Sequence, residues 1–395
     1  MIVRARAIVA GLALGMLVGW LSAAPLGAAA RAAAGIDPEL RDVHRQILRN
    51  PGDAALNLRY AALAERKGLL RKALAAYQRV LIQDPRNAEA RAGLRRVAAQ
   101  LEPDFSAIYL DLGARYATNI RLRADDFGQD KGDVVGDARL VLRDERKLGG
   151  RRWRTLGQLS ADLHAQARSL DFGYLGASTG PLVDLPGDWR VRLAPGAAFA
   201  WLDRKVLFGE LSGQLNFEAL GAGLLRGVDL RFAYQLVGSE FADERDGFVV
   251  EVAPRFARAN LFVEGDQVNV RPRYRLNGAS GRNANPALVQ GDIFPERYHE
   301  FGGEARYLAP FAGGKVLAGP TFRGDVRYYR SNLPGSGTRR RDVYLRPGVE
   351  LIVPNAFRAG HTLVLRYQHE RNLSNAGAKR FQNHVFGIRS VWRLY

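Results

Sequence analysis

Few residues of this chain have the type and spacing that catalysis requires. The sequence of 395 residues contains no cysteine and six histidines. It therefore offers no thiol nucleophile, no zinc–thiolate site and no disulfide scaffold. The histidines form neither an H-x-x-x-H nor an H-E-x-x-H pair, and the chain has no G-x-S-x-G motif, Walker loop or carboxylate–histidine cluster. We expect no enzymatic activity and no bound cofactor.

Two segments still invite a chemical interpretation. His164, in SADLHAQA, lies among the polar residues Ser160, Asp162 and Gln166, which favours a solvated histidine over a catalytic one. The segment DDFGQDKGDVVGD (125–137) is rich in carboxylates that could bind calcium. It lacks the fixed ligand spacing of a known calcium loop, so we predict a solvated surface loop and no metal site.

The chain is strongly basic, with 58 lysines and arginines against 40 acidic residues and a net charge of +18. Such a charge attracts polyanions, including nucleic acids. However, Arg4 and Arg6 precede the apolar run AIVAGLALGMLVGWLSAAPLGAAA, which ends in small residues as a secretory signal peptide does. We predict a signal peptide over 1–30, cleaved after Ala30 or Ala34, rather than a membrane anchor. An exported chain meets little nucleic acid, so none is expected as a partner.

Residues 36–102 have apolar residues at helical spacing. The sequence NPGDA (50–54) recurs as DPRNA (84–88), about 34 residues later, which is the period of a tetratricopeptide repeat. Small residues would let two antiparallel helices approach, a tyrosine would fill the gap between them, and a proline would end the pair. We predict one such repeat, with a half repeat before it and a helix from Ala88 to Leu101 after it; a generic helical hairpin is the alternative. The expected packing residues are Ala61, Gly68, Ala73, Tyr77 and Pro85.

After Pro103 the period of the sequence changes to two. In RGVDLRFAYQLVG, for example, Leu230 and Phe232 alternate with Asp229 and Arg231. Soluble sandwiches also contain alternating strands, but the segments here run for about ten residues, enough to cross a bilayer as tilted strands. We predict about fourteen strands, an even number. They are 105–117, 137–146, 153–167, 170–181, 188–202, 206–217, 224–238, 246–254, 258–271, 299–309, 315–330, 341–353, 360–371 and 378–395.

The connections between these strands are unequal in length. The long ones, 118–136, 239–245, 272–298 and 331–340, all fall on one side, and compact turns such as KLGGRR fall on the other. Long loops outside the cell and short periplasmic turns are typical of outer-membrane barrels. We therefore predict an α + β membrane protein, with a helical module over 36–102 and a transmembrane antiparallel β-barrel over 104–395.

The sequence ends within an expected strand, at HVFGIRSVWRLY, and we expect this last strand to pair with the first and close the barrel. We expect Trp392, Leu394 and Tyr395 to take part in this closure. Basic residues on the inward register predict either a structural network of charges or a cationic conduit for an anionic or polar passenger. The arginines expected to line the lumen are Arg190, Arg192, Arg231, Arg323, Arg327, Arg346, Arg366 and Arg389.

A signal peptide, a short tetratricopeptide module and a barrel of about fourteen strands together resemble the surface lipoprotein assembly modifier family. The final hairpin, YQHERNLSNAGAKRFQNHVFGIRSVW, is similar to the closing strands of that family, with a turn around Ser374 and Asn375 and with Asn383 opening the last strand. The resemblance covers the mature chain in architecture but only these final residues in sequence. The helical part is also shorter than is usual in the family.

The resemblance implies an outer-membrane translocator of a Gram-negative bacterium that moves proteins, often lipoproteins, to the cell surface. The helical module would dock the passenger in the periplasm. The expected partners are outer-membrane lipid, the barrel-assembly machinery and a secreted protein or lipoprotein. A polysaccharide-export porin, which usually has a much longer helical array, and a structural or adhesive barrel are the alternative interpretations.

Overall fold

The computed structural model describes residues 38–101, 103–125, 132–221, 223–238, 246–278, 297–332 and 337–394. The predicted signal peptide (1–30) and Tyr395 lie outside these residues. The chain divides between Asp104 and Phe105 into two compact units, a helical unit and a barrel, which are described separately.

The described part of the helical unit consists of α2 (Pro38–Arg49), α3 (Ala54–Arg66), α4 (Leu70–Gln83) and α5 (Ala88–Leu101). The recurring sequence supplies two helix caps. The Asp53 carboxylate accepts a hydrogen bond from the backbone N–H of Leu56 at 3.0 Å, and the Asn87 side-chain oxygen accepts one from Ala90 at 3.0 Å. Each cap satisfies a backbone donor that a helix leaves unpaired at its start. No helix in the described part of the chain is long and apolar enough to span a bilayer.

Tyr77 lies at the centre of the helical core. It is 2% exposed, and Ala61 and Ala73 are fully buried. A Cβ atom on Gly93 would lie 2.2 Å from the Tyr77 ring, so α5 packs directly on that ring. Gly68 does not have the predicted role in helix contact. It has a φ of +73° and open space around its Cβ position, so it makes the turn between α3 and α4 instead.

A shared carboxylate joins three of the helices. The Tyr77 hydroxyl of α4 donates to Glu65 of α3 at 3.0 Å, and Arg96 of α5 donates to the same carboxylate at 2.6 and 2.8 Å. The hydrogen bond from Arg96 is the main reason that the pKa of Glu65 lies below its usual value. Pro85 lies between α4 and α5, where its carbonyl accepts a hydrogen bond from Arg91 at 2.8 Å. The helices are therefore present as predicted, and their assignment as a tetratricopeptide repeat stays a prediction.

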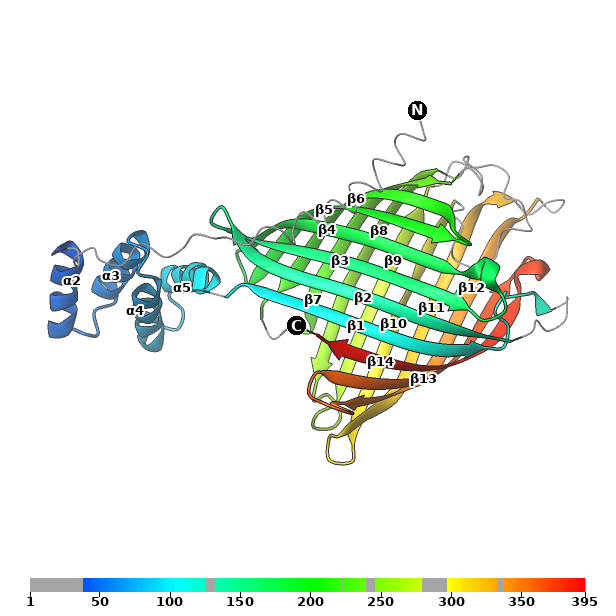
Figure 1. Ribbon diagram of the computed structural model, residues 1–395. Coiled ribbons are helices and arrows are strands. Elements are labelled where there is room, and N and C mark those ends of the chain that lie inside the picture. The colour runs from blue at the N-terminus through cyan, green and yellow to red at the C-terminus, as the bar shows by residue number, and fades with distance from the viewer. Residues whose placement is uncertain are drawn as a thin grey trace. The chain divides into compact units, whose positions relative to one another are not determined.

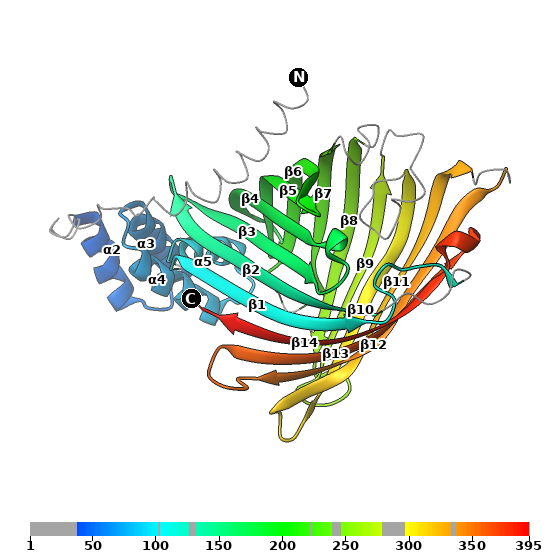
Figure 2. The same ribbon diagram turned by 45° about the vertical axis from the view of Figure 1, so that its right-hand side comes forward.

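The second unit is a closed barrel of fourteen antiparallel strands. In both views β14 (red) lies beside β1 (cyan), and residues Tyr109–Ala117 of β1 pair with Val385–Arg393 of β14 (Figures 1 and 2). This confirms the predicted fold class and strand number. The strands are β1 (Phe105–Ala117), β2 (Asp133–Leu148), β3 (Arg151–His164), β4 (Phe172–Leu185), β5 (Trp189–Leu202), β6 (Lys205–Ala219), β7 (Leu225–Val237), β8 (Gly247–Ala259), β9 (Gln267–Asn277), β10 (Tyr298–Phe311), β11 (Val316–Asn332), β12 (Arg339–Pro354), β13 (His361–Ser374) and β14 (Phe381–Arg393).

The position of β9 corrects the sequence prediction. We expected a strand over 258–271, but β9 covers 267–277 because residues 260–266 form a turn. The Asp266 carboxylate accepts hydrogen bonds from the backbone N–H groups of residues 261–263 and so holds this turn together. Burial alone would raise the pKa of Asp266, but these backbone hydrogen bonds lower it below its usual value. Because Leu261, Phe262 and Val263 of this turn are apolar, the sequence alone does not distinguish the turn from a strand.

The outer face of the barrel carries exposed apolar side chains. On β7, for example, Phe232 is 58% exposed, whereas its neighbour Arg231 points inward and pairs with Glu210 of β6. Apolar bands of this kind face lipid in outer-membrane barrels. Members of the band include Leu112, Leu140, Leu159, Leu193, Leu215, Phe232, Phe301, Phe322, Val349, Leu365 and Ile388.

The ladder between β8 and β9 contains a rung without hydrogen bonds. The N–H of Gly278 donates to the Phe248 carbonyl at 2.8 Å, so these two residues form a hydrogen-bonded pair. In an antiparallel ladder every second pair along the strands is of this type. Pro254 and Pro272 would face each other in such a rung, and proline has no N–H to donate. The pairing runs through Val252 and resumes at Phe256. At this point the wall of the barrel therefore lacks the two hydrogen bonds that residues with an N–H group could form.

Replacing both prolines with valine (Pro254→Val and Pro272→Val) is expected to restore two cross-strand hydrogen bonds. Each such bond contributes about 0.5–1.5 kcal/mol to stability, so hydrogen exchange at the Val252 and Tyr274 amides should slow in the double variant. Each single variant adds one bond and should show about half of the effect on a free-energy scale. Unchanged exchange in the double variant would show that the missing rung does not weaken this ladder.

Candidate functional site in the barrel lumen

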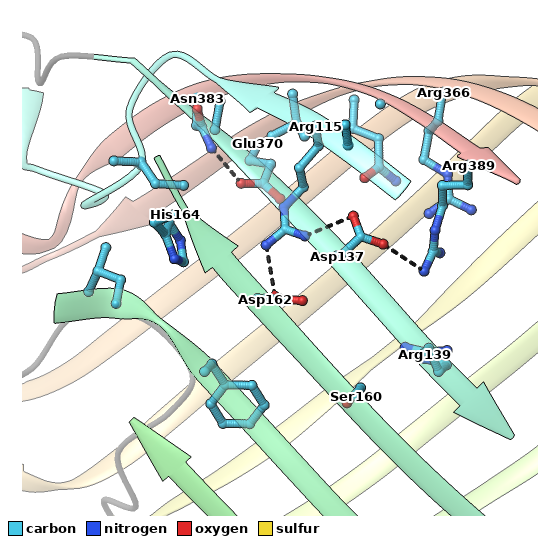
Figure 3. A pocket seen from close by; sticks show the side chains of 18 of the residues that line it. Arg115, Asp137, Arg139, Ser160, Asp162, His164, Arg366, Glu370, Asn383 and Arg389 are labelled. Atoms are coloured by element: carbon cyan, nitrogen blue, oxygen red, sulfur yellow. Dashed lines mark hydrogen bonds and ion pairs between the residues drawn. The ribbon is translucent and has the colours of Figure 1, made fainter. Parts of the chain in front are cut away.

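A cavity of about 760 Å³ is lined by residues of β1–β4 and β12–β14, on both sides of the junction between the first and last strands (Figure 3). Its lining is mostly charged and polar. The side chains reach this cavity because the inward register of each strand carries the charged residues, whereas the outward register carries the apolar ones. The cavity is therefore our candidate functional site.

Alternating charges cross the junction of the strands. Arg389 of β14 lies 2.9 Å from Asp111 of β1 and 3.3 Å from Asp137 of β2. Arg115 of β1 lies 3.3 Å from Asp137 and 2.8 Å from Asp162 of β3. Figure 3 shows Arg115 between these two carboxylates. One solvated ion pair contributes little to stability, but this chain of five side chains connects four strands.

Asn383 of β14 connects β13 with the residues that follow β1, at the end of the junction away from the C-terminus. Its side-chain oxygen accepts hydrogen bonds from the Asn119 N–H at 2.9 Å and from the Thr118 hydroxyl at 3.3 Å. Its amide nitrogen donates to Glu370 at 3.0 Å, as Figure 3 also shows. Asn383 is only 3% exposed. The sequence placed it at the start of the last strand but gave no signal of these contacts, because they depend on how the ends of the chain pair.

Replacing Asn383 with leucine (Asn383→Leu) is expected to destabilise the barrel by about 2–4 kcal/mol, since each buried polar partner left unpaired costs about 1–3 kcal/mol. The measurement is the urea concentration at which the folded, fast-migrating band is lost on a semi-native gel. Gln382→Leu is the matched control, because no hydrogen bond of the Gln382 side chain is found in the described part of the barrel. Equal urea midpoints for the two variants would contradict the role of Asn383.

Two other residues of the cavity differ in solvation. Arg139 is exposed toward the lumen and has no ion pair among the described residues. His164 also lines the cavity, but its side chain is 6% exposed and its Nδ1 lies 3.4 Å from the Asp171 carboxylate. His164 is therefore less solvated than the sequence suggested.

The eight arginines predicted to line the lumen are spread around the barrel. Arg346, Arg366 and Arg389 line the cavity described above, and Arg323 lines a second cavity of about 610 Å³ together with Arg346 and Arg366. These arginines have carboxylate partners: Arg323 lies 2.7 Å from Asp325, Arg346 3.8 Å from Glu370, and Arg366 2.5 Å from Glu350.

The other predicted arginines lie outside both cavities. Arg190 lies 2.6 Å from Asp184, and Arg327 lies 2.6 Å from Glu300. Arg231 pairs with Glu210, as described above. Arg192 differs from the others, since it is 1% exposed and donates to Ser178 and Asn216, which are neutral. The lumen thus contains a network of ion pairs.

The C-terminal residues lie at the other end of the junction. Trp392 pairs with Leu110 of β1 and with His361 of β13, and its ring centre lies 4.1 Å from that of His361. The N–H of Leu394 donates to the Ile108 carbonyl at 2.8 Å. His361 is fully buried, with its Nε2 atom 2.8 Å from the Ser390 hydroxyl. The sequence did not indicate this histidine, because its contacts come from cross-strand pairing.

The acid-rich segment at 125–137 is partly a strand. Residues 126–131 lie outside the described residues, and β2 begins at Asp133. The Asp133 carboxylate accepts hydrogen bonds from the backbone N–H groups of Gln166 and Ala167 and so anchors the β3–β4 connection. In the described part of the chain, no three His, Asp or Glu residues are placed to hold a metal ion.

No protein-family model matches the chain, and neither does any curated protein. Among solved structures, OccAB3 of Acinetobacter baumannii is 11% identical, with a TM-score of 0.39, and the match covers 73% of this chain and 99% of that one. OpdL of Pseudomonas aeruginosa is 13% identical, with a TM-score of 0.37 and the same coverage. The outer membrane protein OpdK of the same organism is 10% identical, with a TM-score of 0.37 and again 73% and 99% coverage. The barrel is therefore established by the strand pairing of this chain, without recourse to these remote similarities.

Proposed function

We propose that the protein is a translocator in the outer membrane of a Gram-negative bacterium and that it moves proteins, surface lipoproteins in particular, through the barrel. The observation that carries the proposal is a closed barrel with a charged lumen, attached to a separate helical unit. The two lumenal cavities have Arg346, Arg366 and Gln368 in common. They therefore adjoin each other and form a polar route for an extended polypeptide.

The helical unit is proposed to dock the passenger in the periplasm. Residues 31–103 contain 14 lysines and arginines against 8 acidic residues, so the unit attracts an acidic partner. Leu48 and Ile82 are 67% and 80% exposed and stand at equivalent positions of the recurring sequence. Exposed aliphatic side chains on a basic surface suit a passenger with an acidic segment and an apolar contact.

The test is surface display in a heterologous Gram-negative host. The protein is co-expressed with the lipoprotein encoded nearest to it, and whole cells are treated with a protease that does not enter the periplasm. We expect the lipoprotein to be cleaved only when the barrel is present. Cleavage to the same extent without the barrel would contradict the proposal, as would protection of the lipoprotein in cells whose outer membrane contains the folded barrel.

A further inference from the structure

The second lumenal cavity has an unusually basic lining. It is lined by residues of the seven strands from β7 to β13 and has a volume of about 610 Å³. Among the described residues that line it, only Glu304 and Glu350 are acidic. Glu304 lies opposite Arg271 and Arg323 in the strand pairing but forms no ion pair within the described part of the barrel. The arginines that line the cavity are Arg226, Arg255, Arg271, Arg306, Arg323, Arg346 and Arg366.

Nearby carboxylates do not balance this charge. Glu350 is shared between Arg306 at 3.4 Å and Arg366 at 2.5 Å. Asp229 is likewise shared between Arg255 at 3.1 Å and Arg271 at 3.5 Å. Three other carboxylates form ion pairs with these arginines within the described residues, namely those of Asp229, Asp325 and Glu370. Together with the two lining glutamates they make five carboxylates, so the seven arginines exceed them by two charges.

Several donors in the same wall have nothing to bind within the described residues. The Nε atoms of Arg271 and Arg346 and the hydroxyl of Thr321 are buried and have no hydrogen-bond partner there. A buried donor without an acceptor is costly, and native proteins contain few of them. Guanidinium groups bind carboxylate and phosphate oxygens with two parallel hydrogen bonds and are favoured wherever such groups are recognised.

We propose that this cavity is a binding site for a small anion that carries two or more negative charges. Its oxygens would accept hydrogen bonds from Arg271, Arg346 and Thr321, and its charge would offset the surplus of arginine. Phosphate groups and clustered carboxylates share this chemistry. Because Arg346 also lines the first cavity, a bound anion lies on the route between the two cavities. The site does not depend on whether the barrel moves proteins.

The test is isothermal titration of the purified, detergent-solubilised protein with pyrophosphate and, separately, with the tricarboxylate tricarballylate, both against a chloride background. We expect at least one of them to bind with a Kd below about 1 mM. Tighter binding of pyrophosphate identifies a phosphate site, and tighter binding of tricarballylate identifies a carboxylate site. No binding of either anion would overturn the proposal.

Variants locate the site within the barrel. Arg271→Gln is expected to weaken binding by about tenfold, which corresponds to about 1.4 kcal/mol. Thr321→Val keeps every charge and should also weaken binding. It therefore replaces Arg271→Gln as the test if that variant does not fold. Arg143→Gln is the matched control, because Arg143 pairs with Glu145 outside the cavity and its loss should leave binding unchanged. Equal affinities for the wild type and both cavity variants would contradict this location.

Discussion

Deletion of residues 392–395 is expected to prevent stable insertion of the barrel. The deletion removes the pairs that Trp392 and Arg393 form with β1 and the hydrogen bond from Leu394 to Ile108. It also uncovers His361, which packs on the Trp392 ring. Unpaired backbone groups in lipid cost several kcal/mol each, so we expect folded barrel in the membrane to fall by about tenfold or more. Quantitative immunoblotting of outer-membrane fractions measures this loss.

The conservative variant Trp392→Phe separates closure of the barrel from general damage to the C-terminus. It keeps the backbone pairing and an aromatic ring against His361, so the barrel should insert at close to normal levels. Truncated protein that reaches the membrane folded and at normal abundance would rule out a closing role for these residues.

Deletion of residues 36–102 is expected to abolish export while the barrel still inserts. The helical unit and the barrel are separate compact units, and the deletion removes no residue of any strand. If the helices dock the passenger, surface display of the lipoprotein should fall to the level seen without the protein. Protease treatment of whole cells measures display, and heat-modifiable migration of the truncated barrel measures its folding.

A double variant tests whether the exposed surface of the helical unit binds the passenger. Leu48→Ser with Ile82→Ser changes two exposed side chains and leaves the core around Tyr77 intact. We expect it to reduce display without altering barrel abundance. Normal display by the deletion variant, with the barrel present at normal levels, would show that the helices are not the docking element.

The sequence predicted most of the elements because each of them carries a local signal. The helix at 88–101 and the strand at 105–117 have the predicted bounds, since a capping Asn87 precedes the helix and the alternation of Ile108, Leu110 and Leu112 with other residues marks the strand. The turn at 260–266 was missed because Leu261, Phe262 and Val263 are apolar, so these residues were placed within the predicted strand 258–271. Gly68 was assigned to helix packing because its spacing does not distinguish a contact from a turn with positive φ.

The arrangement of the lumen could be predicted only in part. Inward arginines follow from the alternation of the strands, but their partners depend on the register between strands. Arg389 meets Asp111 only because the last strand pairs with the first, and Asn383 reaches Asn119 for the same reason. The surplus of arginines around Thr321 arises in the same way, from the pairing of seven strands around one cavity.

The most direct test of the central claim, a β-barrel in the outer membrane, is fractionation combined with semi-native electrophoresis. The full-length protein is expected in the outer-membrane fraction. It should migrate faster when it is unheated than after boiling, because a closed barrel of fourteen strands resists unfolding by detergent at room temperature. Recovery of the protein in the soluble periplasmic fraction, with one mobility before and after heating, would contradict the account.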